Sequence, residues 1–226
     1  MIKLIFLCKR RPDITRDEYA KRILEGHVPL ALEHHPTLRG YVINIAEGGQ
    51  EDGEGFDSLH ALSFDSLEDY RERLFDSPEG EQVIRRDVQR FLAGADSYST
   101  SERIHRDESA ARLRHERSPG VKWMCALKRH TGLNHAEFVD HWLGVQVPML
   151  LQQRPEITRC VTNVVEARLS EAGEDWDGLT ELHFARPEDA KEDPFAPAET
   201  NRTTEANGDR FVARSQTWPV REYVQL

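Results

Sequence analysis

The sequence predicts an α+β protein built from two tandem ferredoxin-like repeats, each with the element order β-α-β-β-α-β. The chain has 226 residues with 38% apolar and 31% charged residues, a composition typical of a globular protein. It also matches itself: residues 2–47 align with 121–166 at a shift of 119 without a gap, and the match continues at a shift of 120. The period is of domain size, too long for a solenoid repeat. Matched identities include Lys3/Lys122, Lys9/Lys128, Glu18/Glu137, Pro29/Pro148, Asn44/Asn163, Asp57/Asp177, Leu62/Leu182 and Phe64/Phe184.

Each repeat opens with a strand and a capped helix. Residues 2–9 alternate and are rich in aliphatic side chains, which predicts a β-strand. Thr15 and Glu18 have the spacing of a capping box, in which each side chain satisfies a free N–H group of the first helical turn. Asn134 and Glu137 repeat that spacing in the second copy. A helix is therefore expected to begin at the same place in both repeats.

Two strands and a loop are predicted next. Pro29 and Pro36 are expected to end the first helical segment, because proline cannot donate a backbone hydrogen bond. Residues 40–46 and 59–64 then have strand character, and the acidic, glycine-rich segment 48–55 between them is expected to be a hairpin loop.

The repeat ends with helical segments and a fourth strand. Residues 66–75 and 79–92 are predicted to be helical, and 96–104 to be strand four. In the second copy, Pro194 and Pro197 interrupt the corresponding helix, so a loop or partial helix is expected over 188–203. The sequence thus predicts repeats over 1–104 and 121–226, joined by a linker over 105–120. A sheet of this order leaves one face without helices, and the second repeat can cover it.

Charge and cysteine content exclude several classes of partner. The net charge of −10 disfavours binding to nucleic acid and to an anionic membrane surface. The apolar N-terminal run is too short to span a membrane, and its basic cluster follows the run instead of preceding it as in a signal peptide. Three cysteines without C-x-x-C spacing indicate reduced, buried thiols. We therefore expect a cytoplasmic protein.

Several short motifs follow one another in the same order in both repeats. They are residues 2–12, Tyr19, His27-Val28-Pro29-Leu30 and Tyr41 in the first, and Lys128-Arg129, Gly132-Leu133, Glu137-Phe138, His141-Trp142 and Val147-Pro148 in the second. Their order resembles an EthD-type domain. The resemblance implies a dimeric α+β barrel, here pseudo-dimeric within one chain, and a neighbourhood of small cofactor-free proteins. These include polyketide cyclases, fungal pigment-pathway decarboxylases and dehydratases, and accessory proteins of xenobiotic degradation.

Neither repeat carries the whole pattern. The histidine at the end of the helix in the family is present as His27 but replaced by Gln146 in the second repeat. The family's tryptophan is present as Trp142 but replaced by Ile23 in the first. The first repeat is therefore the better candidate for an active site.

His27 and Tyr41 are candidate catalytic residues. An imidazole with a pKa near neutrality can remove a proton next to a carbonyl group or deliver one to a leaving hydroxyl group. The alternative is that His27 is a structural residue at a helix C-terminus. Tyr41 could hold a substrate oxygen through its hydroxyl group, or could anchor the rim of the strand.

His60 is the third candidate catalytic residue. By strand alternation it lies on the sheet face that should meet the helices, where the resemblance places the pocket. A hydrogen-bonded core histidine is the alternative. The same face should carry the substrate-binding residues Leu4, Phe6, Cys8, Leu62 and Phe64.

Glu181 and His183 are predicted to lie on the opposite face of their strand, as a buried polar contact between sheets. His34-His35, His130, His135 and His141 lack the spacing of a metal site, and no phosphate-binding loop or nucleophile motif is present. We expect neither a metal nor a cofactor.

Three functions remain open. The leading one is a cofactor-independent enzyme that catalyses cyclisation, dehydration or decarboxylation of a small apolar carbonyl or aromatic compound. A non-catalytic accessory or small-molecule-binding protein is the second, and a cofactor-free oxygenase the third. A homodimer of the duplicated chain is also compatible with the sequence.

Overall fold

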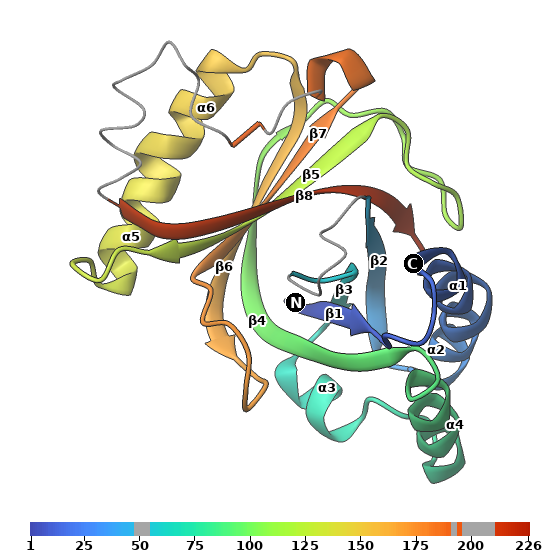
Figure 1. Cartoon of the computed structure of the whole chain (residues 1–226). Helices are drawn as coiled ribbons and strands as arrows, with labels where there is room; N and C mark the ends of the chain where they lie inside the picture. The colour runs from blue at the N-terminus through green and yellow to red at the C-terminus, as the bar shows by residue number, and fades with distance from the viewer. Residues whose placement is uncertain (48–54, 191–193, 196–210) are drawn as a thin grey trace.

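Eight antiparallel strands form a closed barrel in the computed structural model, which describes residues 1–47, 55–190, 194–195 and 211–226 (Figure 1). Going round the barrel, the strands follow the order β1-β3-β2-β8-β5-β7-β6-β4. The α+β class is thereby confirmed. The strands are β1 (Ile2–Arg10), β2 (Leu38–Ala46), β3 (Ser58–Phe64), β4 (Leu92–Asp107), β5 (Val121–Arg129), β6 (Ile157–Arg168), β7 (Gly178–Phe184) and β8 (Val212–Val224).

The last strand of each half closes the barrel by pairing with the other half. β4 pairs with β1 on one side and β6 on the other, and β8 pairs with β5 and β2. Strand four was predicted over 96–104 only, which is too short. It starts at Leu92 and continues to Asp107, because its second half finds hydrogen-bond partners along β6. The first residues of the predicted linker therefore belong to the sheet.

The helices of the first half are α1 (Arg16–Lys21), the π-helix η1 (Arg22–His27), α2 (Val28–His34), α3 (Leu67–Glu72) and α4 (Pro78–Val88). Thr15 caps α1 as predicted, accepting the backbone N–H of Glu18 at 3.2 Å. The other half of the predicted capping box is not formed, because the Glu18 carboxylate accepts from Arg22 instead. The prediction that Pro29 ends the helical segment was wrong. Val28 donates instead to Ile23 in a π-turn, and Pro29 falls in the first turn of α2, where its missing N–H costs nothing.

The second half repeats this arrangement with α5 (His135–His141), the π-helix η2 (Trp142–Gln146) and α6 (Val147–Gln153). Its capping box is complete, with Asn134 and Glu137 each bonded to the other's backbone N–H. Where a loop or partial helix was expected, a 3₁₀ turn spans Pro187–Ala190. Most of 188–203 and of the predicted 48–55 loop lies outside the described residues. No helix within the described ranges has the length and apolarity to cross a membrane.

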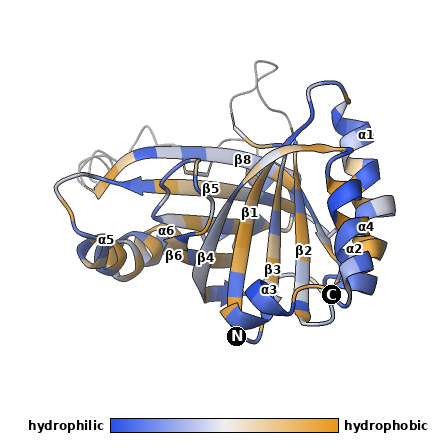
Figure 2. Ribbon diagram, turned by 90° about the horizontal axis from the view of Figure 1, so that it is seen from below, coloured by the Kyte–Doolittle hydropathy of each residue, from blue (hydrophilic) through white to orange (hydrophobic). Residues whose placement is uncertain are grey.

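Apolar side chains form three clusters, two between helices and sheet and one inside the barrel. In Figure 2 the helices of the first half lie along the outer surface of β1, β2 and β3. Strand alternation sends Leu4 toward those helices and Ile5 into the barrel. The barrel interior is apolar around Met124 and Trp218 and polar at the end where β1 and β5 begin.

Candidate functional site

A chain of four buried polar side chains lies between the sheet and the helices of the first half. The Tyr19 hydroxyl group of α1 is 2.7 Å from Ser58 Oγ on β3, and Ser58 Oγ is 3.0 Å from His60 Nε2. His60 Nδ1 is in turn 3.1 Å from the Tyr41 hydroxyl group on β2. Both ring nitrogens of His60 therefore have partners, and the structure brings the predicted residues His60 and Tyr41 into direct contact.

Burial keeps this chain uncharged. It lowers the pKa of His60 to about 3, helped by the nearby charge of His27. It also raises the pKa values of Tyr19 and Tyr41 far above the ordinary value for a phenol. These groups can therefore orient and polarise a bound oxygen, but they cannot easily exchange protons near neutral pH.

His27 ends the π-helix η1 and makes a different kind of contact. Its Nδ1 lies 3.1 Å from Asp87 Oδ2 on α4, and its ring meets the Phe91 ring edge-on at 5.3 Å between centroids. A neutral His27 that donates Nδ1–H to this carboxylate presents Nε2 as the proton acceptor. Within the described residues, Nε2 has no hydrogen bond.

The predicted substrate-binding residues all lie on or beside this face. Leu4 and Phe64 are buried in its apolar cluster, and Phe6 and Leu62 pack against it half-buried. Cys8 is buried near Ser58, and burial raises the pKa of its thiol to about 12, so it is not a nucleophile.

Sequence analysis missed three members of this site: Tyr19 as a polar group, Ser58 and Asp87. Each gains its role through a partner 39 or 60 residues away. The only signal in the sequence was the contrast between the two repeats.

The second half lacks the polar chain. The positions that correspond to Tyr19, Tyr41, Ser58 and His60 hold Phe138, Cys160, Gly178 and Thr180. The Trp142 ring takes the space: a Cβ atom added to Gly178 would lie 2.4 Å from it. Aromatic packing thus stands in the second half where the first half has hydrogen bonds, and the described residues contain this candidate site once.

One known protein family matches the first half of the chain. The sequence model of the EthD domain matches residues 11–95. Residues 11–95 form an EthD domain. This range contains Tyr19, His27, Tyr41, Ser58, His60 and Asp87, so the whole polar chain and the His27–Asp87 pair belong to it.

Several solved structures share the fold of the whole chain, from the EthD domain through the second half of the barrel. An anthrone oxidase-like protein aligns with a TM-score of 0.68 at 9% identity, covering 99% of this chain and 92% of its own. A candidate monooxygenase from Fusobacterium nucleatum gives 0.60 at 7% identity, with 99% and 93% covered. A mutant chlorite dismutase from Candidatus Nitrospira defluvii gives 0.52 at 9%, with 98% and 91% covered. No curated protein sequence matches the chain.

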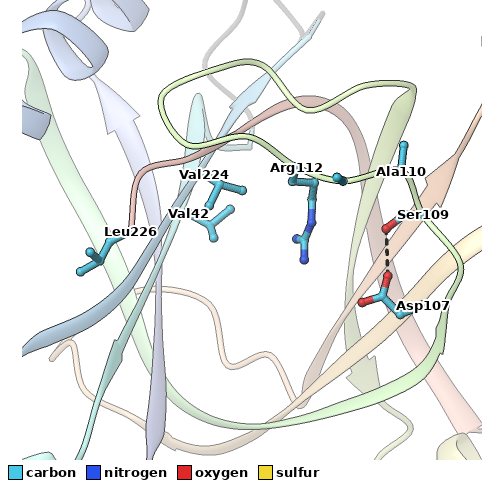
Figure 3. A pocket seen from close by; sticks show the side chains of 8 residues that line it. Val42, Asp107, Ser109, Ala110, Arg112, Val224 and Leu226 are labelled. Atoms are coloured by element: carbon cyan, nitrogen blue, oxygen red, sulfur yellow. Dashed lines mark hydrogen bonds between the residues drawn. The ribbon is translucent and has the colours of Figure 1, made fainter.

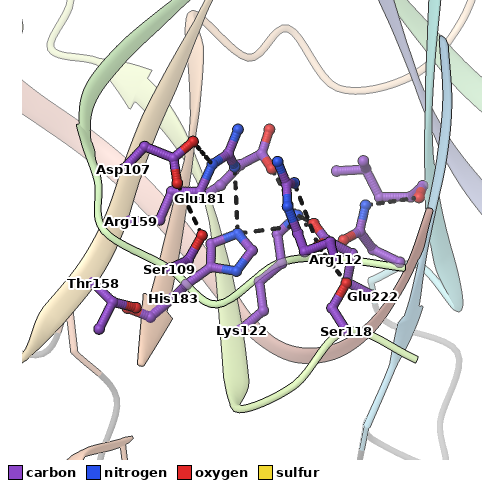
Figure 4. A network of polar contacts seen from close by, with 12 residues as sticks. Asp107, Ser109, Arg112, Ser118, Lys122, Thr158, Arg159, Glu181, His183 and Glu222 are labelled. Atoms are coloured by element: carbon purple, nitrogen blue, oxygen red, sulfur yellow. Dashed lines mark hydrogen bonds and ion pairs between the residues drawn. The ribbon is translucent and has the colours of Figure 1, made fainter. Parts of the chain in front are cut away.

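A second polar cluster lies inside the barrel, outside the EthD domain (Figure 4). Lys122 Nζ is 2.6 Å from both Glu181 Oε2 and Glu222 Oε2. Lys3 Nζ is 2.9 Å from Glu181 Oε1 and also contacts Glu102. Two lysines that match in the repeat thus share one glutamate. Glu181 and His183 were predicted to form a buried polar contact. Both are buried, but Glu181 pairs with the two lysines, whereas His183 Nε2 lies 3.8 Å from Glu222 Oε2.

The lysines determine the ionisation of this cluster. Burial alone would raise the pKa of Glu181, but Lys122 and Lys3 hold it well below its ordinary value. Glu222 likewise has its pKa lowered to about 2 against burial, mainly by Lys122. Burial and the charge of Lys122 lower the pKa of His183 to about 3. Glu181, His183 and Glu222 place ligand atoms within 4.8 Å of one another, but a metal ion would have to displace the Lys122 ammonium group.

Proposed function

We propose that the EthD domain is a cofactor-independent enzyme acting on a small, largely apolar carbonyl or aromatic compound. His27 is the general acid and base, Asp87 positions it, and Tyr41, oriented by its hydrogen bond to His60, holds the substrate oxygen. The observation that carries the proposal is the His27–Asp87 pair at 3.1 Å, beside a neutral hydrogen-bonding chain in the same helix–sheet layer.

The two sets of groups suit the two needs of such a reaction. His27 Nε2 removes a proton next to the substrate carbonyl, and the resulting imidazolium is stabilised by the Asp87 carboxylate. Charge that develops on the substrate oxygen is stabilised by a hydrogen bond from the neutral Tyr41–His60 pair. The imidazolium then returns its proton to the product carbon or to a leaving hydroxyl group. Cyclisation and dehydration use both steps. A decarboxylation uses only the second: loss of CO₂ from the substrate leaves the carbanion, and a protonated His27 delivers the proton to it.

We also propose that the chain is a tandem duplication whose ferredoxin-like halves form one pseudo-dimeric barrel. The matched π-helices and the two reciprocal seams, β2 with β8 and β4 with β6, support it. With the second helix–sheet layer filled by Trp142, one active site per chain follows.

The test is a screen against phenols, β-diketones and aromatic polyketides, with binding followed by NMR and turnover by chromatography. His27→Ala is expected to fold and to lose turnover. His34→Ala is the matched control, because His34 Nδ1 also contacts an aspartate, Asp76, at 3.2 Å on an exposed part of the same half. Turnover that survives in His27→Ala would overturn the assignment.

Two alternative functions have an observation in their favour. The dense apolar packing around Tyr41 and Ile23 favours an accessory or binding protein without chemistry. The neighbours named anthrone oxidase-like and monooxygenase favour a cofactor-free oxygenase. Oxygen consumption during turnover would indicate the oxygenase, and saturable binding without turnover would indicate the accessory role.

A further inference from the structure

A cavity of about 430 Å³ lies at the polar mouth of the barrel, and none of the residues that line it belongs to the polar chain or to the His27–Asp87 pair. Figure 3 shows the chain between β4 and β5 passing over it. Three apolar side chains, Val42, Val224 and Leu226, lie on one side, and polar side chains lie on the other. Its lining residues are Val42, Asp107, Ser109, Ala110, Ala111, Arg112, Val224 and Leu226.

Arg112 is the polar group with unused hydrogen-bonding capacity at this mouth. Its guanidinium group points into the cavity (Figure 3) and makes an ion pair with Glu222 Oε1 at 3.5 Å. That oxygen already accepts a 2.7 Å hydrogen bond from the Ser118 hydroxyl group, and Glu222 Oε2 accepts from Lys122. Arg112 makes no hydrogen bond to any described residue. A guanidinium group has five N–H donors in a planar fork that matches a carboxylate.

The carboxylates near the cavity are already neutralised. Asp107 accepts from the Ser109 hydroxyl group at 2.8 Å and from Arg159 Nε at 3.2 Å. Glu222 is held by the buried Lys122 ammonium group at 2.6 Å. An anion at Arg112 would therefore be repelled less by these carboxylates, because each is paired with a cation. The nearest free N–H donors would be those of Arg112.

The segment that carries Arg112 is fixed at both ends. Glu108 donates its backbone N–H to Thr158 at 2.7 Å, and Ser118 donates to Glu222 at 2.8 Å. His115 also donates to Val224 at 2.7 Å. Arg112 is thus held over the mouth from both β6 and β8, which limits the entropy that it would lose on binding a ligand.

We propose that this mouth is a second ligand site, which binds a small monocarboxylate with a short branched aliphatic chain. The carboxylate pairs with the Arg112 guanidinium group, and the aliphatic chain packs on Val42, Val224 and Leu226. The site requires neither His27 nor turnover, so its existence is independent of the function proposed above.

Isothermal titration calorimetry and ¹⁵N NMR with isovalerate test this site. Isovaleramide, which has the same shape but no charge, is the ligand control. Arg112→Gln should weaken isovalerate binding by at least about tenfold, the factor expected for losing one charge-assisted pair. Arg117→Gln is the matched control, because Arg117 lies in the same segment and also makes a single ion pair at 3.5 Å, with Glu47 outside the cavity.

Ala111→Phe provides a second variant that leaves Arg112 in place and fills the cavity; it too should abolish binding. Three results together would support the site. Isovalerate binding is lost in Arg112→Gln and Ala111→Phe, it is kept in Arg117→Gln and His27→Ala, and the wild-type protein does not bind isovaleramide. Equal binding in Arg112→Gln, equal binding of isovaleramide, loss in His27→Ala, or no saturable binding by the wild-type protein would each overturn it.

Discussion

Two histidines of the EthD domain lie in the same layer and differ in what they contact. His27 faces a carboxylate, Asp87, whereas the ring nitrogens of His60 contact the neutral hydroxyl groups of Ser58 and Tyr41. A carboxylate stabilises an imidazolium ion, while neutral partners and burial disfavour one. This contrast supports the proposed roles, in which His27 transfers the proton and His60 orients the substrate.

Asp87→Asn should lower kcat by about a hundredfold, because an amide cannot stabilise the imidazolium form of His27. Steady-state kinetics on a substrate found in the screen measures it. Asp76→Asn, which alters the exposed His34 pair, should leave kcat unchanged. A purely structural role for Asp87 would change the melting temperature instead of kcat.

The pH dependence of stability should reveal His60. Its folded pKa of about 3 lies below the value of 6.5 for a free histidine. The unfolded chain therefore binds more protons, and stability falls as the pH decreases from about 6.5 toward 3. His60 alone contributes a slope of about 1.4 kcal/mol per pH unit in this window.

Urea unfolding at several pH values between 7 and 4 measures this slope. His60→Gln should reduce the slope by the contribution of one histidine and leave that of His183 in place. An unchanged slope would mean that the pKa of His60 is the same in the folded and the unfolded protein.

At the scale of elements, local sequence signals determined where strands and helices begin. Alternation located β1, β2 and β3, and the Thr15 and Asn134 caps located α1 and α5. The prediction failed where tertiary contacts decide. Pairing with β6 extends β4, and a π-turn carries the helix through Pro29. Neither the partner strand nor the π-turn has a signal in local sequence.

The contact of Trp142 in the π-helix η2 with Gly178 in β7 distinguishes the second half from the first. Replacing these residues by those of the first half tests this contact. Gly178→Ser restores the residue of the first half but places its side chain within the Trp142 ring, at a cost of about 1–3 kcal/mol. In a Trp142→Ile background the same change should cost less than about 1 kcal/mol, because the ring is gone. Chemical denaturation of the four proteins in this cycle gives the coupling energy. Additive effects would show that the two residues do not compete for space.

At the scale of the whole molecule, the barrel interior joins strands from both halves through Lys122 and Lys3. Glu181 of β7 contacts Lys122 of β5 and Lys3 of β1. The repeat showed that the lysines match, but nothing in the sequence identified their partners, since the partners lie across the barrel. The same limit hid Asp87 and Ser58, although strand alternation placed His60 on the sheet face that meets the helices.

Lys122→Met should destabilise the protein by about 3–5 kcal/mol, because it leaves the buried carboxylates of Glu181 and Glu222 without their shared cation. Lys3→Met should cost less, because Lys3 and Glu102 are more exposed and Glu181 retains Lys122. Equilibrium unfolding at pH 7 compares the two variants. Equal losses of unfolding free energy would mean that the ion pairs of Lys122 are no more buried than those of Lys3.

The chain passes from one half of the barrel to the other once, between the end of β4 at Asp107 and the start of β5 at Val121. The last strand of each half nevertheless pairs with a strand of the other half: β4 pairs with β6, and β8 pairs with β2. Cleavage of the chain between Asp107 and Val121 would therefore leave two polypeptides that remain hydrogen-bonded to each other along two pairs of strands. Such a protein is suited to fragment complementation, in which two separately made pieces restore the barrel only when they meet.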